Sequence, residues 1–174
     1  MTSAVLLDRF IRSVPDFPKP GILFRDITPL LAAPDALREA VHQMGQPFRD
    51  EGITKIAAAE ARGFLFGTAM AIDMAVGFVP VRKPGKLPAE TIEASYELEY
   101  GTDTLQIHRD AFGPDDRVLI VDDLLATGGT LAACVELVRQ TGATVVGCSC
   151  LIGLTELNGR DRLGDLPCLT LLDY

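Results

Sequence analysis

Continuous apolar runs alternate along the chain with segments whose apolar residues recur every three or four positions. Runs typical of strands buried on both faces occur at residues 55–59, 77–81, 118–121, 143–151 and 168–172. The helical spacing between them predicts helices over residues 34–48, 64–76 and 131–138. This alternation is typical of an α/β fold, so we expect one doubly wound, mostly parallel sheet with helices on both faces.

The N-terminal part has a different pattern. Residues 4–14 carry apolar side chains at helical spacing and predict a first amphipathic helix, after which prolines and a glycine make residues 15–21 extended and turning. The apolar residues 22–24 and then Arg25 follow. They either pack over an edge of the sheet or form one wall of a flat slot for a planar ligand, and the pattern leaves both interpretations open.

Residues 91–109 alternate apolar and polar positions on both sides of Gly101, Thr102 and Asp103. Such alternation around a turn predicts a β-hairpin, and an isolated hairpin is only marginally stable. We therefore expect residues 91–110 to form a flexible flap that excludes water when a substrate binds. The alternative is an edge hairpin packed permanently on the sheet.

Composition is consistent with one domain spanning residues 1–174, with residues 1–33 as a small N-terminal hood. The chain has 174 residues, of which 48% are hydrophobic and 23% charged, as in a globular domain. Its formal net charge of −8 argues against a general nucleic-acid or anionic-membrane binder. An anionic substrate must therefore be held by a few placed basic groups and by backbone N–H dipoles.

Residues 64–81 are apolar enough to be mistaken for a membrane span. Asp73 lies at the centre of this stretch, where a charge costs roughly 2.5–3.5 kcal/mol on insertion scales, so we expect a buried helix followed by a strand. The four cysteines form no C-x-x-C pair and indicate no zinc site. We expect reduced core thiols and a cytoplasmic protein.

Residues 117–130 contain the most informative pattern. A buried strand is followed by Asp122 and Asp123, then by a turn of small residues and hydroxyls, then by a helix; the turn consists of Ala126, Thr127, Gly128, Gly129 and Thr130. Backbone N–H groups in such a turn, with the positive end of the helix dipole, suit a phosphate. The turn lacks the Gly-Lys-[Ser/Thr] ending of a nucleoside-triphosphate loop and the G-x-G-x-x-G pattern of the dinucleotide fingerprint. The alternative is an ordinary turn with solvated acids.

Basic side chains follow two other strands. Arg62 lies in a turn beside Gly63, and the loop after residue 81 carries Arg82, Lys83 and Lys86. Parallel strands bring such loops to one edge of the sheet, where these cations would suit a diphosphate. The alternatives are a surface pair between Arg62 and Glu60, and a solvated basic loop.

The segment VLIVDDLLATGGT resembles the phosphoribosyl-diphosphate motif of the type I phosphoribosyltransferases. FPKPGILFRDITPLL, AAAEARGFLFG, VPVRKPGKLP, YELEYG and LTELNGRDRL follow the order seen in the adenine-specific family of that group. The resemblance covers about residues 10–165. It departs at Gly153, where we expect an acidic residue in many relatives, and this puts a local contact in doubt.

The resemblance implies a purine-salvage enzyme that transfers the phosphoribosyl group of 5-phosphoribosyl 1-diphosphate to adenine, giving AMP and diphosphate. It also implies a homodimer, with residues 64–76 at the interface, and Mg²⁺ held mainly by the substrate, near Asp122 and Asp123. No nucleic acid or membrane partner is expected. Two alternatives stay open: a sibling that uses hypoxanthine, guanine or xanthine, and a non-catalytic regulator that senses phosphoribosyl diphosphate.

By the same resemblance, each set of residues acquires a role. The turn 126–130 would bind the 5′-phosphate, and Asp122 with Asp123 would bind the ribose hydroxyls. The diphosphate would contact Arg62, Arg82, Lys83 and Lys86. Adenine would lie against Leu23, Phe24 and Arg25. Glu99 would be the catalytic acid/base, although Glu93 and Glu97 share its composition and solvent-facing pattern.

Overall fold

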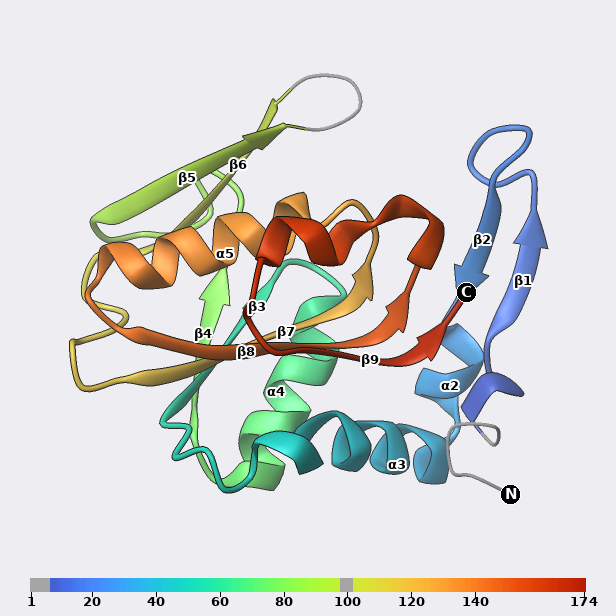
Figure 1. Cartoon of the computed structure of the whole chain (residues 1–174), viewed down its shortest axis with the longest axis horizontal. Helices are drawn as coiled ribbons and strands as arrows, with labels where there is room; N and C mark the ends of the chain where they lie inside the picture. The colour runs from blue at the N-terminus through green and yellow to red at the C-terminus, as the bar shows by residue number, and fades with distance from the viewer. Residues whose placement is uncertain (1–6, 98–101) are drawn as a thin grey trace.

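A five-stranded parallel sheet with the strand order β4-β3-β7-β8-β9 forms the centre of the molecule (Figure 1). The structure is a computed structural model, and it describes residues 7–97 and 102–174. The strands are β3 (Lys55–Ala59), β4 (Gly77–Val81), β7 (Arg117–Leu125), β8 (Thr144–Gly153) and β9 (Cys168–Asp173). The doubly wound, mostly parallel α/β prediction is confirmed.

Helices cover both faces of the sheet. On one face lie α2 (Thr28–Ala32), α3 (Pro34–Gly45), the 3₁₀ turn η1 (Gln46–Phe48) and α4 (Gly63–Met74); on the other lies α5 (Gly129–Gln140). The central strand supplies both cores, because Leu119 and Val121 pack toward α3 and α4 while Val118 and Ile120 pack toward α5. All four are fully buried, which explains why this strand reads as a continuous apolar run.

The central strand is longer than its apolar run. Residues 118–121 are in β7 as predicted, but the strand continues to Leu125 and includes both aspartates. The extra length comes from its neighbour, since Asp122 pairs with Cys150 and Leu125 with Gly153 of β8. Ladder pairing, which the hydrophobic pattern does not encode, carries the acid pair on a rigid strand rather than in a loop.

The helix predicted over residues 4–14 is wrong in its second half. Arg12–Pro15 is strand β1, which pairs antiparallel with β2 (Leu23–Asp26). Pro15 disfavours the helical region for the residue before it and cannot continue a helix, whereas Val14 finds a partner in Phe24. Residues 4–6 lie outside the described part of the chain.

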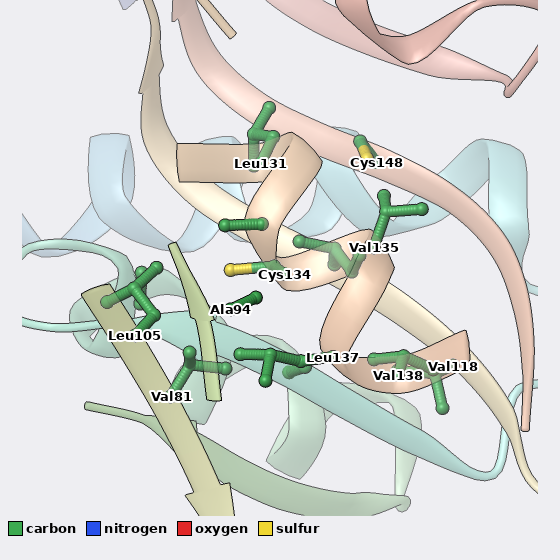
Figure 2. Close-up of a cluster of buried hydrophobic side chains, with 14 of the residues drawn as sticks. Val81, Ala94, Leu105, Val118, Leu131, Cys134, Val135, Leu137, Val138 and Cys148 are labelled. Carbon is green, nitrogen blue, oxygen red and sulfur yellow. The ribbon is translucent and has the colours of Figure 1, made fainter. Parts of the chain in front are cut away.

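The predicted hairpin is present as β5 (Thr91–Glu97) and β6 (Thr102–His108). Thr102 and Asp103 belong to the second strand, where they lie opposite Glu97 and Tyr96. The prediction that these two residues form the turn is therefore wrong. Figure 2 shows Ala94 and Leu105 in one cluster with side chains of α5. The root of the hairpin is therefore core structure, and movement of its tip stays a prediction.

The polar connection between β8 and β9 contains the 3₁₀ turns η2 (Thr155–Leu157) and η3 (Gly159–Leu163). The four cysteines are free, and burial raises the pKa of Cys134, Cys148 and Cys150. Within the described ranges, no helix is long and apolar enough to span a membrane. The stretch 64–81 is indeed a helix followed by a strand.

Candidate functional site

A cavity of about 330 Å³ lies where β3 and β7 end. Its walls come from the turn after β3, from the end of β7, from the glycine-rich turn before α5 and from the inner face of the hairpin. The carboxyl ends of parallel strands are where open α/β sheets bind ligands. Elements far apart in sequence thus deliver their polar groups to one space.

The glycine-rich turn lines this cavity with all five of its predicted residues. Gly128 has a φ of +81° and directly precedes α5, whose first turn carries no side-chain cap. A Cβ at Gly128 would lie 2.3 Å from the Gly159 carbonyl oxygen, so both conformation and space require glycine here. The first N–H groups of this helix have no side-chain cap and are therefore suited to an anion.

The two aspartates at the end of β7 are buried and differ in their partners. The Asp123 N–H donates to Asp122 Oδ1 at 2.9 Å, and Asp123 Oδ2 accepts from Arg62 Nε at 2.6 Å. Burial, with the neighbouring Asp123 charge, raises the pKa of Asp122 well above its ordinary value. A Cβ on Gly63 would approach Asp122 Oδ1 to 2.9 Å, so α4 begins close against this carboxylate.

Two of the four predicted diphosphate cations line the cavity, and both already have acidic partners. Arg62 pairs with Asp123 rather than with Glu60, and Lys83 Nζ lies 3.1 Å from Asp103 Oδ2. These two basic groups therefore lie where an anion could bind. Their positive charges are offset by neighbouring carboxylates before any substrate binds.

Arg82 and Lys86 are outside the cavity lining. Arg82 pairs with Glu60 at 3.2 Å, and its Nε is buried without a hydrogen-bond partner in the described part of the chain. The N–H of Lys83 donates to Glu60 and lowers the pKa of that carboxyl, with a smaller contribution from the Arg82 guanidinium. Glu60 thereby fixes the start of the basic loop.

The residues predicted to contact the base form a separate group on β2. Phe24 packs edge-on against Phe17, with ring centroids 5.1 Å apart. Arg25 donates to Ser13 Oγ at 2.6 Å and lies over the Tyr174 ring at 3.8 Å. Neither these two nor Leu23 lines the cavity, so their contact with a base stays a prediction. Glu99 lies outside the described residues.

Tyr96 and Asp103 are cavity residues that the sequence reading missed. The Thr130 hydroxyl donates to Tyr96 Oη at 3.3 Å, and the Tyr96 hydroxyl donates to Asp103 Oδ2 at 3.4 Å. The two residues are cross-strand partners and so share one face of the hairpin. With the turn assigned correctly, the period-2 alternation from Leu105 would have placed Asp103 on the inner face.

The departure at Gly153 has a local explanation. A Cβ there would lie 2.5 Å from Asp173 Oδ1 and 3.0 Å from Thr170 Cγ2. Asp173 Oδ1 accepts from the Thr170 hydroxyl at 2.5 Å, and Arg160 also donates to that hydroxyl oxygen. The carboxylate of Asp173 thus occupies the space beside residue 153, and the position has no room for a side chain unless Asp173 moves.

A glycine-rich turn at an uncapped helix start, an acid pair and paired cations around one cavity are typical of the phosphoribosyltransferase class. The family model described as "Phosphoribosyl transferase domain" matches residues 26–171. An adenine phosphoribosyltransferase of Rhodopirellula baltica is 56% identical over 168 residues, which cover 97% of this chain and 82% of that protein. The chain belongs to the adenine phosphoribosyltransferase family.

Solved structures agree with this assignment. The adenine phosphoribosyltransferase of Thermoanaerobacter pseudethanolicus superposes with a TM-score of 0.95 at 48% identity, covering 98% of this chain and 99% of that one. The Saccharomyces cerevisiae enzyme, solved with D-2,5-dideoxy-2,5-imino-altritol 1,6-bisphosphate and adenine, has a TM-score of 0.92 at 40% identity. It covers 98% of each chain. The resemblance to this family is confirmed.

Proposed function

We propose that the cavity at the end of β7 transfers the phosphoribosyl group of 5-phosphoribosyl 1-diphosphate to adenine. The family activity is purine salvage that forms AMP. One observation supports this cavity as the site of that reaction: the 126–130 turn and two buried aspartates line the same space. The yeast relative solved with a bisphosphate and adenine carries the pair of ligand types that the proposal requires.

The 5′-phosphate would bind in the turn 126–130. Backbone N–H groups at the start of α5, with the Thr127 and Thr130 hydroxyls, are donors to its oxygens, and the helix dipole favours its charge. Asp122 and Asp123 would accept hydrogen bonds from the ribose hydroxyls. Because the aspartates are on a paired strand and the turn follows directly, the distance between phosphate and ribose subsites is fixed before substrate arrives.

Transfer then requires two bond changes at the anomeric carbon and the loss of one proton from the purine. A ring nitrogen of adenine forms a bond to that carbon, the bond to the diphosphate oxygen breaks with its electron pair, and the purine loses an N–H proton. Arg62 and Lys83 would stabilise the negative charge that grows on the leaving diphosphate. Arg82 and Lys86, now outside the cavity lining, would join them if the loop after β4 moves toward the substrate.

Adenine would be held by the hood hairpin β1–β2. Leu23 is half exposed on this hairpin, and Phe24 and Arg25 are already ordered by Phe17, Ser13 and Tyr174. Their ordering lowers the entropic cost of stacking against a planar base. Glu99 would take the purine proton from the flap side. A Glu99→Gln enzyme with full turnover would remove it from the mechanism.

The residues present suit Mg²⁺ only as an ion carried largely by substrate. In the described ranges no group of three or more His, Cys, Asp or Glu side chains could hold a metal. Two neighbouring carboxylates, Asp122 and Asp123, are hard oxygen donors that could complete a shell made of phosphate oxygens and water. Bound there, the ion would neutralise charge on the diphosphate.

A homodimer in the cytoplasm completes the proposal. Helix α4 is apolar on its outer surface as well, with Ile72 77% exposed and Leu65 47% exposed, one helical repeat of seven residues apart. A second copy of the chain would cover these side chains. Sedimentation showing a monomer at micromolar concentration would contradict the dimer. The four free cysteines suit a reducing compartment.

The direct test mixes the protein with labelled adenine, 5-phosphoribosyl 1-diphosphate and Mg²⁺ and measures labelled AMP. Hypoxanthine, guanine and xanthine are offered in parallel reactions, because a sibling specificity would transfer to one of them instead. Omission of Mg²⁺ tests the cofactor. A protein that binds phosphoribosyl diphosphate in equilibrium dialysis but yields no nucleotide with any base would be a regulator rather than an enzyme.

A further inference from the structure

Asp103 lies on the inner face of the hairpin, where a charged residue is unexpected. Side chains two apart on a strand share a face, and Leu105 and Ile107 on that face are buried in the core against α5. Asp103 is the next residue of this series toward the tip, and its side chain is only 24% exposed. The hairpin therefore directs a carboxylate into the cavity rather than into solvent.

This carboxylate has a specific partner. Lys83 Nζ lies 3.1 Å from Asp103 Oδ2, and the Tyr96 hydroxyl donates to the same oxygen at 3.4 Å. Burial alone would raise the pKa of Asp103, but its hydrogen bonds with Lys83 and the Thr104 N–H outweigh burial and lower it. The same ion pair raises the pKa of Lys83. Both groups are therefore charged at neutral pH, and each satisfies the other.

An ammonium group paired in this way has one of its N–H donors engaged by a carboxylate. Lys83 has three N–H donors, and a phosphate oxygen that approaches along the direction taken by Asp103 must displace the carboxylate. An anion entering the cavity must also approach the negative charge of Asp103 itself. Both effects weaken the binding of a diphosphate and leave uncharged ligands unaffected.

We propose that Asp103 competes with the substrate's diphosphate for Lys83 and so lowers the affinity of the cavity for 5-phosphoribosyl 1-diphosphate. The proposal rests on the function proposed above and deepens it, because it gives a hairpin residue a role in setting the affinity for the substrate. When the diphosphate takes Lys83, the link between the basic loop and β6 is released. Asp103 is thus a positioning residue that acts through Lys83.

The test compares Asp103→Asn with Glu93→Gln. Both substitutions remove one negative charge from the same hairpin, but Glu93 is on an exposed position outside the cavity lining. We expect Asp103→Asn to lower the KM for 5-phosphoribosyl 1-diphosphate about two- to fivefold, as suits a partly exposed ion pair, without changing the KM for adenine. Glu93→Gln should leave both values unchanged. Asp103→Glu, which can still reach Lys83, should retain the original KM.

A double-mutant cycle separates competition from a structural role. In a Lys83→Ala background, the added Asp103→Asn substitution should improve affinity less than it does when Lys83 is present, because only the direct repulsion by Asp103 is then removed. Melting temperatures establish that each variant is folded. If Asp103→Asn does not fold, Asp103→Ala replaces it in the cycle.

The outcomes are distinct. An unchanged or raised KM in Asp103→Asn, or an equal improvement with Lys83 absent, would overturn the competition. If the unsubstituted protein itself forms no AMP, the proposed function fails, and direct binding of phosphoribosyl diphosphate to the same variants still tests Asp103.

Discussion

The cavity has two groups of hydrogen-bond donors that could bind an anion, and they differ in chemistry. The turn before α5 offers backbone N–H groups, which carry no net charge and are fixed by the fold. The basic side consists of the side chains of Arg62 and Lys83, which are already paired with Asp123 and Asp103. Under the proposed function, the backbone N–H groups can bind a phosphate without rearrangement, whereas Arg62 and Lys83 must first exchange their acidic partners.

This difference predicts unequal sensitivity to substitution. Removing one donor from a rigid cradle deforms all its neighbours, because the N–H groups belong to one continuous chain. Removing one cation deletes an interaction that was already partly offset by an internal acid. The predictions below test this comparison from the largest expected effect to the smallest.

Gly128→Ala should have the largest effect. Its Cβ would lie 2.3 Å from the Gly159 carbonyl oxygen at a φ of +81°, so the turn must move. We expect AMP formation to fall about a hundredfold or more, because displacement of a bound group by about 1 Å costs that much. Steady-state kinetics measure this. Stability should also fall by about 2–3 kcal/mol in denaturant titration.

Gly164→Ala is the matched control for that substitution. Gly164 also has a positive φ, of +59°, but a Cβ there would meet nothing within 4 Å. It should cost stability through backbone strain alone and leave the activity per folded molecule unchanged. If both variants lost activity equally, the close approach of residue 159 to the turn would not matter.

Arg62→Ala should have a smaller effect on the transfer. The variant loses a guanidinium from the diphosphate side and leaves the buried Asp123 unpaired. We expect kcat/KM for 5-phosphoribosyl 1-diphosphate to fall about tenfold to thirtyfold, because the half-exposed Arg62 side chain should contribute at the lower end of the about 1.5–3 kcal/mol typical of hydrogen bonds to charged groups. Arg38→Ala removes an exposed guanidinium from a surface pair with Asp35 and should change nothing. A loss as great as that of Gly128→Ala would erase the distinction between the subsites.

Asp122→Asn should separate stability from function. Burial raises the pKa of Asp122, so its favourable contribution is present below its unfolded pKa and is lost as pH rises through the folded pKa. Asparagine does not ionise, so the loss of stability at higher pH is absent in this variant. Its side-chain oxygen can still accept the hydrogen bond from the Asp123 N–H. We expect a melting temperature about 2–4 °C higher near neutral pH and no gain in acid. Substrate affinity should fall. A lower melting temperature at neutral pH would contradict the cost of the buried charge.

Asp116→Asn should have the smallest effect and none on transfer. Asp116 lies outside the cavity lining and accepts from Lys55, Thr54 and the Gly113 N–H. Burial alone would raise the pKa of Asp116, but these hydrogen bonds outweigh it and lower the pKa. Its stabilisation is therefore present above the unfolded pKa and lost as pH falls through the folded one. We expect a loss of about 1 kcal/mol near neutral pH that vanishes in strong acid, measured by urea unfolding.

Much of this architecture could be predicted from the hydrophobic pattern. Strands 55–59 and 77–81 match β3 and β4 residue for residue, because apolar runs end where polar loops begin. The helix stripe of Leu131 and Cys134 is buried as expected. The acid pair and the glycine-rich turn were identified because unusual residue types follow one another within a single segment of chain.

Features that depend on pairing between distant segments were not predictable. Strand β1 exists because β2 offers it a partner, although its spacing favours a helix. The extension of β7 depends on β8, and the inward position of Asp103 depends on the hairpin register. Ion-pair choice is equally non-local: Glu60 pairs with Arg82 instead of the nearby Arg62, which reaches Asp123.

The contact between Gly159 and the glycine-rich turn constrains the evolution of the connection between β8 and β9. Surface connections of this kind usually accept insertions and deletions without penalty. Here a Cβ on residue 159 itself would come within 2.1 Å of the Ala126 carbonyl oxygen. The backbones of the two segments are therefore so close that neither Gly128 nor Gly159 has room for a side chain. Changes of length between residues 155 and 163 should therefore be rare among functional variants of this chain, even though most of that stretch faces solvent.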